Sequence, residues 1–375
     1  MTRRDVMVVG GGLIGLATAW RAAREGMRVT VVSDAARATA SRAAVGGLSF
    51  CPADAVLTGH RATIELSAIA RAGFGAYVSK LEKASGVPTR FRRQATLMGQ
   101  LRQPDAGLID RVEAARRLVG LESLRLTGDE CREREPGMSE EVTAGLLIED
   151  HEQIDARAFT DSLWAACVNS GVEFVWGIVA GIVSSSGRAT GVCLESGEVR
   201  EADHVVVAAG SWSSAIDGLP EELRHAVRPL SGQTVIVRLA DGMEAPRHDL
   251  RSAGVYMVSR SDRTIVLGAT KVDRGFDQAP TASAVLSLVS AAAQLWSPVL
   301  DCEWQETTVG LRPQSRDGLP IVGPTSLPGL HVATAHFRNG LMFGPASADA
   351  VIDGILGGTP REQFEAFSPL REVIR

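Results

Sequence analysis

The stretch Asp5-Val6-Met7-Val8-Val9-Gly10-Gly11-Gly12-Leu13-Ile14-Gly15 decides how this chain of 375 residues begins to fold. An apolar run enters a glycine turn, helical spacing follows over Leu16–Arg24, and a second β-branched run stands at Val29–Val32. This order predicts one right-handed β-α-β unit. A GxGxxG pattern between such a strand and such a helix is typical of a dinucleotide-binding fold.

Each glycine of the pattern has a mechanical role in that fold. Gly10 makes the tight turn, Gly12 lets a pyrophosphate approach the backbone, and Gly15 lets the helix pack closely on the strand. The helix N-terminus adds N–H groups and the positive end of its dipole. The acidic residue expected after the second strand is displaced by one position, because Ser33 stands there and Asp34 follows. Either side chain could reach a ribose hydroxyl.

The rest of the chain alternates between helical and β-rich segments. We expect helices at Leu57–Gly86, Pro104–Gly120, Phe159–Val168 and Pro345–Leu356. We expect strands at Val172–Trp176, Ile178–Val183, Val192–Leu194, His204–Ala209, Gln233–Leu239, Gly254–Ser259, Thr264–Ala269 and Leu330–Thr334. The period-2 strands between residues 228 and 309 are typical of an antiparallel sheet.

These segments predict an α/β fold with two domains. A Rossmann-like dinucleotide-binding domain is expected to be discontinuous and to comprise residues 1–82, 151–216 and 307–375. An inserted, mostly antiparallel β substrate domain is expected to comprise residues 83–150 and 217–306.

Composition excludes several classes of protein. Lys and Arg number 39 against 44 Asp and Glu, a formal charge of −5, so no basic field is present to bind nucleic acid. No uninterrupted apolar run approaches the roughly 18 residues that a membrane-spanning helix needs. The first residues lack the cleavage site of a secretion signal, so we expect a cytoplasmic protein without a membrane partner.

The cysteines do not form a metal or disulfide pattern. Five are scattered along the chain without a CxxC spacing: Cys51, Cys131, Cys167, Cys193 and Cys302. An odd number of scattered cysteines favours reduced, mostly buried side chains, and no metal site is expected.

Five segments occur in an order that carries a family resemblance: Gly10–Gly15, Ala40–Leu48, Ala208–Trp212, Gly310–Pro313 with Asp317–Pro320, and His336–Gly340. The chain resembles glycine oxidase within the D-amino-acid oxidase superfamily of FAD-dependent amine oxidases. The pairing of Gly-Leu-Arg-Pro with His-Phe-Arg-Asn-Gly is specific to this group, and the resemblance spans almost the whole chain. It implies that the dinucleotide domain is a two-dinucleotide FAD-binding domain.

The resemblance also implies which residues contact FAD. The expected set is Gly10, Gly12, Leu13, Ile14, Gly15, Ser33, Asp34, Ala40, Ser41, Val45, Gly46, Gly47, Val179, Ala209, Gly210, Trp212, His336, Phe337, Arg338, Asn339, Gly340, Leu341 and Met342. Some relatives attach the flavin through a cysteine, which would fall at about Gly310 here. Glycine cannot form that bond, so noncovalent FAD is expected.

Three residues are expected to bind the substrate. Arg312 is similar to the family's carboxylate-binding arginine, Arg338 to a second arginine near the substrate, and Tyr256 to the pocket tyrosine. A guanidinium matches a carboxylate in geometry, and Arg312 lies in an apolar segment, which favours this role over a surface ion pair. The alternatives are a flavin or structural contact for Arg338 and a core position for Tyr256. His336 is interpreted as a structural or flavin-neighbouring histidine rather than a catalytic base.

The resemblance implies oxidative deamination of a small amino acid of the glycine, sarcosine or D-amino acid type. Hydride would pass from the α-carbon to the flavin, and dioxygen would be reduced to hydrogen peroxide. The expected partners are thus an amine or amino-acid substrate and dioxygen, and a homo-oligomer stays open. The alternatives are a biosynthetic flavin oxidase of an N-substituted glycine or other unusual amine, a quinone-linked dehydrogenase, and a flavin-bearing protein without turnover.

Overall fold

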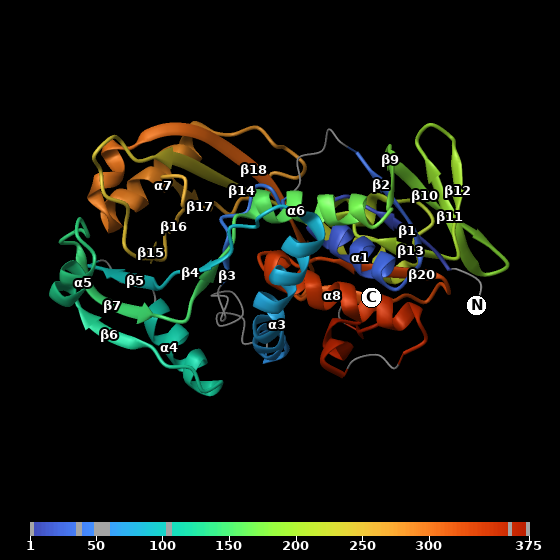
Figure 1. Cartoon of the computed structure of the whole chain (residues 1–375), viewed down its shortest axis with the longest axis horizontal. Helices are drawn as coiled ribbons and strands as arrows, with labels where there is room; N and C mark the ends of the chain where they lie inside the picture. Colours follow the sequence, from blue (N-terminus) through green and yellow to red (C-terminus); the bar gives the residue numbers. More distant parts are fainter. Residues whose placement is uncertain (1–3, 35–39, 49–60, 103–106, 359–361, 373–375) are drawn as a thin grey trace.

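The protein has two lobes, each built on one large sheet (Figure 1). The structure is a computed structural model that describes residues 4–34, 40–48, 61–102, 107–358 and 362–372. One lobe holds a six-stranded sheet with helices packed on it, and the other holds an eight-stranded sheet. The expected α/β class, with a dinucleotide-type domain and a mostly antiparallel one, is confirmed.

The six-stranded sheet has the order β19-β20-β13-β1-β2-β9. Its strands are β1 (Asp5–Val9), β2 (Arg28–Ser33), β9 (Glu173–Trp176), β13 (His204–Val207), β19 (Ile321–Pro324) and β20 (Leu330–Thr334). All neighbours are parallel except β19 and β20. Helix α1 (Leu13–Arg24) connects β1 to β2, so the predicted β-α-β unit is confirmed.

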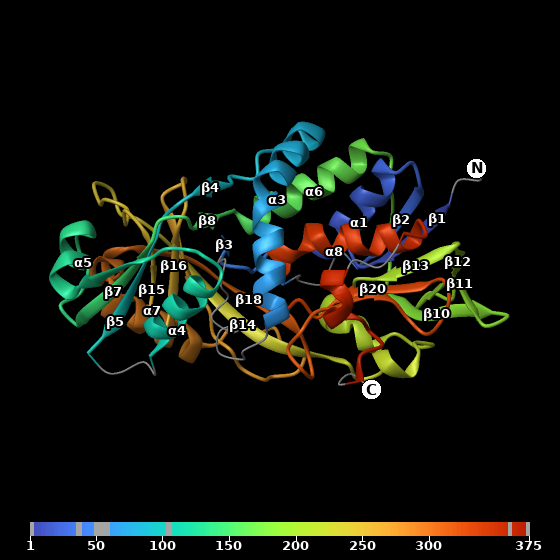
Figure 2. The same cartoon turned by 90° about the horizontal axis from the view of Figure 1, so that it is seen from below.

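Both faces of this sheet are covered, which explains why its central strands β1 and β13 are almost entirely apolar. Val6 and Val8 pack among helices, whereas Met7 and Val9 pack on the opposite side, because successive side chains of a strand point to opposite faces. The helices are α1, α3 (Arg61–Ser85), α6 (Ala156–Asn169) and α8 (Gly340–Ile355), and Figure 2 shows α1, α6 and α8 on one side of the sheet. The opposite side is covered by β10 (Val179–Ser185), β11 (Arg188–Leu194) and β12 (Val199–Glu201).

The eight-stranded sheet has the order β18-β14-β17-β16-β15-β5-β7-β6. Its strands are β5 (Thr96–Leu101), β6 (Leu124–Thr127), β7 (Val142–Ile148), β14 (Val227–Arg238), β15 (Asp249–Arg251), β16 (Tyr256–Ser259), β17 (Thr264–Gly268) and β18 (Glu303–Ser315). Only β15 and β5 are parallel neighbours. Helix α7 (Ala282–Leu295) covers one face through Leu288 and Leu295.

Smaller elements complete the described chain. Helices α4 (Leu108–Leu118) and α5 (Gly128–Arg134) lie beside β5–β7. A small sheet of order β3-β8-β4 joins β3 (Gly47–Leu48), β8 (Glu152–Gln153) and β4 (Arg92–Arg93). The 3-10 turns are η1 (Gly210–Ala215), η2 (Glu221–Leu223), η3 (Ser297–Asp301) and η4 (Glu362–Phe367). The division of the sequence into two domains stays a proposal. The expected boundary between residues 306 and 307 falls inside β18, and β18 pairs with β14 along the whole strand.

The expected helices differ from those observed at their ends. Phe159–Val168 lies within α6, and Pro104–Gly120 is observed as α4 from Leu108, with residues 104–106 outside the described residues. The last helix was expected from Pro345, but α8 begins at Gly340 and contains Pro345, so that expectation was wrong. Pro345 is the sixth residue of α8, beyond the first turn, so its missing N–H removes one hydrogen bond of the helix interior. The expected helix at Leu57–Gly86 is observed from Arg61, and residues 57–60 lie outside the described residues.

Over the described ranges, no helix is both long and apolar enough to cross a membrane. The place of the protein in the cell stays a prediction from sequence.

Candidate active site

A cavity of about 560 Å³ is lined by residues from both lobes. Its walls are the glycine turn after β1, the ends of β2 and β13, the start of β10, the first turn of α8, and one face of the eight-stranded sheet. All of the expected site residues line this cavity except Gly15. Their individual roles stay predictions, but the structure brings them to one place.

Gly15 lies beneath the glycine turn rather than on the cavity wall. A Cβ at this position would overlap the carbonyl oxygen of Gly10. Gly10 itself has a φ of +114°, a region that L side chains rarely adopt. Gly10 therefore suits the tight turn and Gly15 the close packing of α1 against β1, which are the roles predicted from the sequence.

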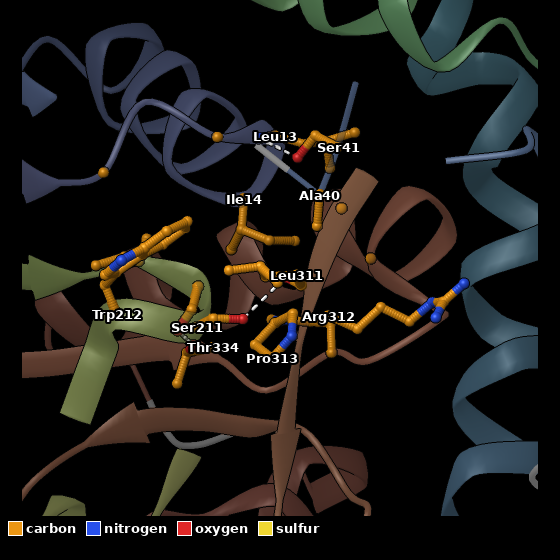
Figure 3. Close-up of a pocket in the computed structure, with 18 of the residues that line it drawn as sticks. Leu13, Ile14, Ala40, Ser41, Ser211, Trp212, Leu311, Arg312, Pro313 and Thr334 are labelled. Carbon is orange, nitrogen blue, oxygen red and sulfur yellow. Dashed lines mark hydrogen bonds between the residues drawn. The ribbon is translucent and has the colours of Figure 1, made fainter. Parts of the chain in front are cut away.

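The N-terminus of α1 is built to accept an anion. Its N-cap is Gly12, which has no side-chain cap, and a Cβ there would meet only the Ser41 Oγ at 3.6 Å. The backbone N–H of Leu13 donates to that hydroxyl over 3.0 Å (Figure 3). The space above Gly12 and the helix dipole fit a pyrophosphate. Ser33 holds the turn by accepting a hydrogen bond from the Gly11 N–H at 3.1 Å.

A second helix N-terminus opens on the same cavity. The N-cap of α8 is Asn339, again without a side-chain cap, and Gly340, Leu341 and Met342 of the first turn line the wall. Phe337, just before the helix, has a φ of +51°, so the loop is held in a conformation that is rare for a bulky residue. This arrangement supplies N–H groups and a positive dipole end, which fit an electron-rich edge of a flavin.

His336 is a buried neutral side chain. Its Nε2 lies 2.8 Å from the Ser347 Oγ, and in the described structure its Nδ1 has no hydrogen-bond partner. Burial lowers the pKa of His336 from 6.5 to about 3, so the ring carries no charge at neutral pH. A ring nitrogen that faces no protein partner fits a cofactor contact. The interpretation of His336 as a flavin neighbour agrees with this environment.

Arg312 lies on the face of the eight-stranded sheet that lines the cavity. It projects from β18 over Gly232 of β14, where a Cβ would overlap its guanidinium. Its Nη1 donates to the Thr270 carbonyl oxygen at 2.9 Å, which orients the side chain. Figure 3 shows Arg312 extending away from Trp212 and Ser211. A guanidinium held in this way can bind a carboxylate with two parallel hydrogen bonds.

Tyr256 lies against the cofactor-binding segment. Its hydroxyl occupies the place that a Cβ on Gly47 would take, and this hydroxyl is 3.2 Å from the His151 Nε2. Burial raises the pKa of Tyr256 well above 10 and lowers the pKa of His151 to about 3. Both groups are therefore neutral at physiological pH. Tyr256 can donate a hydrogen bond but cannot act as a base.

Sequence reasoning missed two side chains of this site. Arg251 lines the cavity with its guanidinium 5.4 Å from the centre of the Tyr256 ring, and His151 contacts the Tyr256 hydroxyl. Neither stands in a motif, and only the pairing of β15 with β16 brings Arg251 beside Tyr256. The second expected arginine, Arg338, lies over the Phe337 ring at 5.4 Å.

The fold and the cavity define an FAD-binding oxidoreductase with separate cofactor and substrate lobes. Residues 5–353 match the family described as "DAO: FAD dependent oxidoreductase". The chain belongs to this family, and the expected cofactor, FAD, is thereby confirmed.

Relatives of known name cover nearly all of the chain. It is 32% identical over 358 residues to the bifunctional protein ThiO/ThiG of Nostoc sp., a match to 94% of this chain and 53% of that protein. It is 29% identical over 363 residues to the glycine oxidase of Geobacillus kaustophilus, a match to 94% and 93% of the two chains. The chain thus spans about half the length of the bifunctional relative.

The crystal structure of glycine oxidase from Geobacillus kaustophilus has the same fold. It superposes with a TM-score of 0.90 at 26% identity and covers 99% of this chain and 100% of the other. The expected superfamily is confirmed by these comparisons.

We expect the purified protein to be yellow and to release its FAD when denatured by acid or heat. Gly310 offers no sulfur, and a Cβ there would meet the Ala43 Cβ at 2.9 Å and the Ala40 Cα at 3.2 Å. Among the described residues that line the cavity there is no cysteine. The measurement is flavin absorbance in the supernatant after acid precipitation. Flavin that stays with the precipitated protein would show a covalent bond.

Proposed function

We propose that the protein oxidises the Cα–N bond of a small amino acid, of the glycine, sarcosine or D-amino acid type, and transfers the electrons to dioxygen. The observation that carries the proposal is Arg312, an oriented cation on the wall of the same cavity that the glycine turn and the two helix N-termini line. A protein that only stored FAD would have no use for a carboxylate-binding arginine there. The name of the 29% identical relative, glycine oxidase, also supports it.

The residues of the chain would bind and orient, and would not carry out acid–base chemistry. Arg312 would fix the α-carboxylate, and Tyr256 would wall the pocket and offer a neutral hydrogen-bond donor. His151 and His336 are neutral and buried, so neither supplies a charge to the pocket at neutral pH. FAD, when bound, supplies the acceptor for the hydride of the α-carbon. The contribution of the protein is therefore the alignment of the substrate, which can account for several orders of magnitude in rate.

A second candidate is a biosynthetic oxidase whose product serves a further reaction. It is favoured by the match to a bifunctional protein of which this chain spans about half. Both candidates share the oxidation of a small amine. They differ in which amine is preferred and in what consumes the product.

The proposal is tested by an aerobic assay of the yellow protein with glycine, sarcosine, N-ethylglycine and bulky D-amino acids. We expect small primary and secondary amino acids to be oxidised faster than bulky ones, because Tyr256 closes the pocket. Hydrogen peroxide should form in a one-to-one ratio to dioxygen consumed. Turnover with a soluble quinone but not with dioxygen would make the protein a dehydrogenase and contradict the oxidase proposal.

A further inference from the structure

The face of the eight-stranded sheet that lines the cavity is low between two large side chains, Tyr256 on β16 and Arg312 on β18. Over the described residues, the positions of β17 and β14 that line the cavity are Gly268 and Gly232, and Gly310 follows on β18. Tyr256 pairs with Gly268, and Gly232 pairs with Gly310. Because glycine has no Cβ, these three positions form a floor on which another group can lie close to the sheet.

A segment of the other lobe, residues 40–48, lies across this glycine floor. A Cβ on Gly310 would meet the Ala43 Cβ at 2.9 Å, and a Cβ on Gly268 would overlap the Val45 Cγ2. Both segment residues also line the cavity. The glycines of the sheet therefore make room for side chains that arrive from the cofactor side.

The contacts of this segment fall on alternate residues. Beyond Val45, the segment meets the sheet again at Gly47, where the Tyr256 hydroxyl fills the place of a Cβ. The intervening Ala44 and Leu48 pack in the core around α1 instead. Successive side chains of an extended chain point to opposite sides. The side chain of Val45 is therefore directed at the substrate sheet, and its backbone stays available for the FAD contact predicted from the sequence.

Val45 is the largest side chain that the segment places on the glycine floor. Its neighbours on the same side, an alanine and a glycine, contribute at most one methyl group. Branching at Cβ restricts χ1, so the two methyl groups of Val45 cannot easily turn aside. Gly268 lies opposite Tyr256 on the next strand towards β18, about 4.8 Å away. Val45 thus occupies the space beside the Tyr256 ring on the side of Arg312.

We propose that Val45 is a specificity-determining residue, whose two methyl groups limit how large a substituent the substrate can carry between Tyr256 and Arg312. The inference rests on the proposed function and narrows its substrate class to glycine and amino acids with a short substituent. With the α-carboxylate on Arg312, the rest of the substrate extends over the glycine floor towards Tyr256 and meets Val45. A longer chain on the α-carbon or on the nitrogen would overlap the valine.

Turnover of a pair of substrates measures this limit as the ratio of kcat/KM for D-norvaline to that for glycine. We expect the ratio to rise at least about 10-fold in Val45→Ala, because one or two methylene groups in an apolar pocket change such ratios by about this factor. Val45→Ile should lower it. Val45→Thr keeps the branched shape and should restore the wild-type ratio. Val199→Ala, an exposed position on β12, should leave it unchanged.

Gly268→Ala gives an independent test, because the added methyl group competes with Val45 for one place. It would overlap the Val45 Cγ2, so Gly268→Ala should lower the unfolding temperature. In the Val45→Ala background, the Cβ of residue 45 would lie 3.6 Å from the added methyl group, an ordinary contact. The double variant should therefore regain unfolding temperature and FAD content, and its substrate ratio should return towards the wild-type value. A contact of 3.1 Å with the Thr234 Cγ2 is common to both backgrounds.

Ligands that cannot be oxidised separate this inference from the proposed function. In the FAD-loaded protein, the perturbation of the flavin absorption band reports the dissociation constants of methoxyacetate and of the longer butoxyacetate. We expect Val45→Ala to strengthen the binding of butoxyacetate relative to methoxyacetate at least about 10-fold. Such a shift without oxidation of any amino acid would support the role of Val45 and overturn the proposed function. Oxidation of glycine by a Val45→Ala protein that changes all substrates and ligands by an equal factor would overturn the inference.

Discussion

Arg312→Ala is expected to keep FAD bound but to lower kcat/KM for amino acids by roughly 30-fold or more. Removing one partner of a desolvated, hydrogen-bonded charge pair costs on the order of 2 to 5 kcal/mol, and 1.4 kcal/mol corresponds to about a tenfold change. The guanidinium lies over Gly232, and β18 (Glu303–Ser315) holds no other Lys or Arg that could replace its charge. Arg312→Lys should also lose most activity, because an ammonium keeps the charge but not the two parallel donors.

The matched control is Arg228→Ala, an exposed arginine on β14 of the same sheet. Steady-state kinetics, FAD content and thermal unfolding are measured for each variant. Normal turnover in Arg312→Ala would place the carboxylate-binding group elsewhere. A loss of FAD or a large fall in the unfolding temperature would instead indicate a structural role for Arg312.

Gly15→Ala is expected to destabilise the protein by about 3 kcal/mol or more and to abolish FAD retention. The added methyl group would overlap the Gly10 carbonyl oxygen, which is backbone and cannot move aside as a side chain can. Forcing atoms into a packed position typically costs 1 to 3 kcal/mol, and displacing α1 from β1 adds to this. Thermal unfolding and bound FAD are the two measurements.

Two other glycines serve as comparisons for Gly15. Gly73 lies within α3 with no atom within 4 Å of a Cβ, so Gly73→Ala should be neutral or slightly stabilising. Gly12→Ala should leave the apoprotein stable but weaken FAD binding, since its Cβ would enter the space expected to hold the pyrophosphate. Retention of FAD by Gly12→Ala would place the phosphates away from this turn.

The first β-α-β unit could be predicted from sequence because its signals are local. A glycine turn flanked by an apolar strand and a helix with regular spacing needs no distant partner to be identified. The expected strand Leu330–Thr334 likewise matches β20 at both ends. The cavity residues were found through the order of short segments along the chain. The structure places Gly10–Gly12 and His336–Met342 on one cavity although they are more than three hundred residues apart in sequence.

Other features could not be predicted because their causes are not local. Strands β5, β6 and β7 were not expected in residues 83–150, since their alternation is short and β5 pairs with β15 from a distant segment. Arg251 stands on a strand of three residues and gains its neighbour Tyr256 only when the sheet forms. The start of α8 was missed because Pro345 was interpreted as the first residue of a helix. The helix begins instead at Gly340, so Pro345 lies in its interior.

Anaerobic mixing of the FAD-loaded protein with a small amino acid shows directly whether the bound flavin accepts electrons from such a substrate. We predict that glycine, sarcosine or a small D-amino acid bleaches the absorption band of the oxidised flavin, and that air restores the band with release of peroxide. Arg312→Ala should bleach at least about 30-fold more slowly at a low substrate concentration. An oxidised band that persists with every one of these amino acids in the wild-type protein would contradict the account.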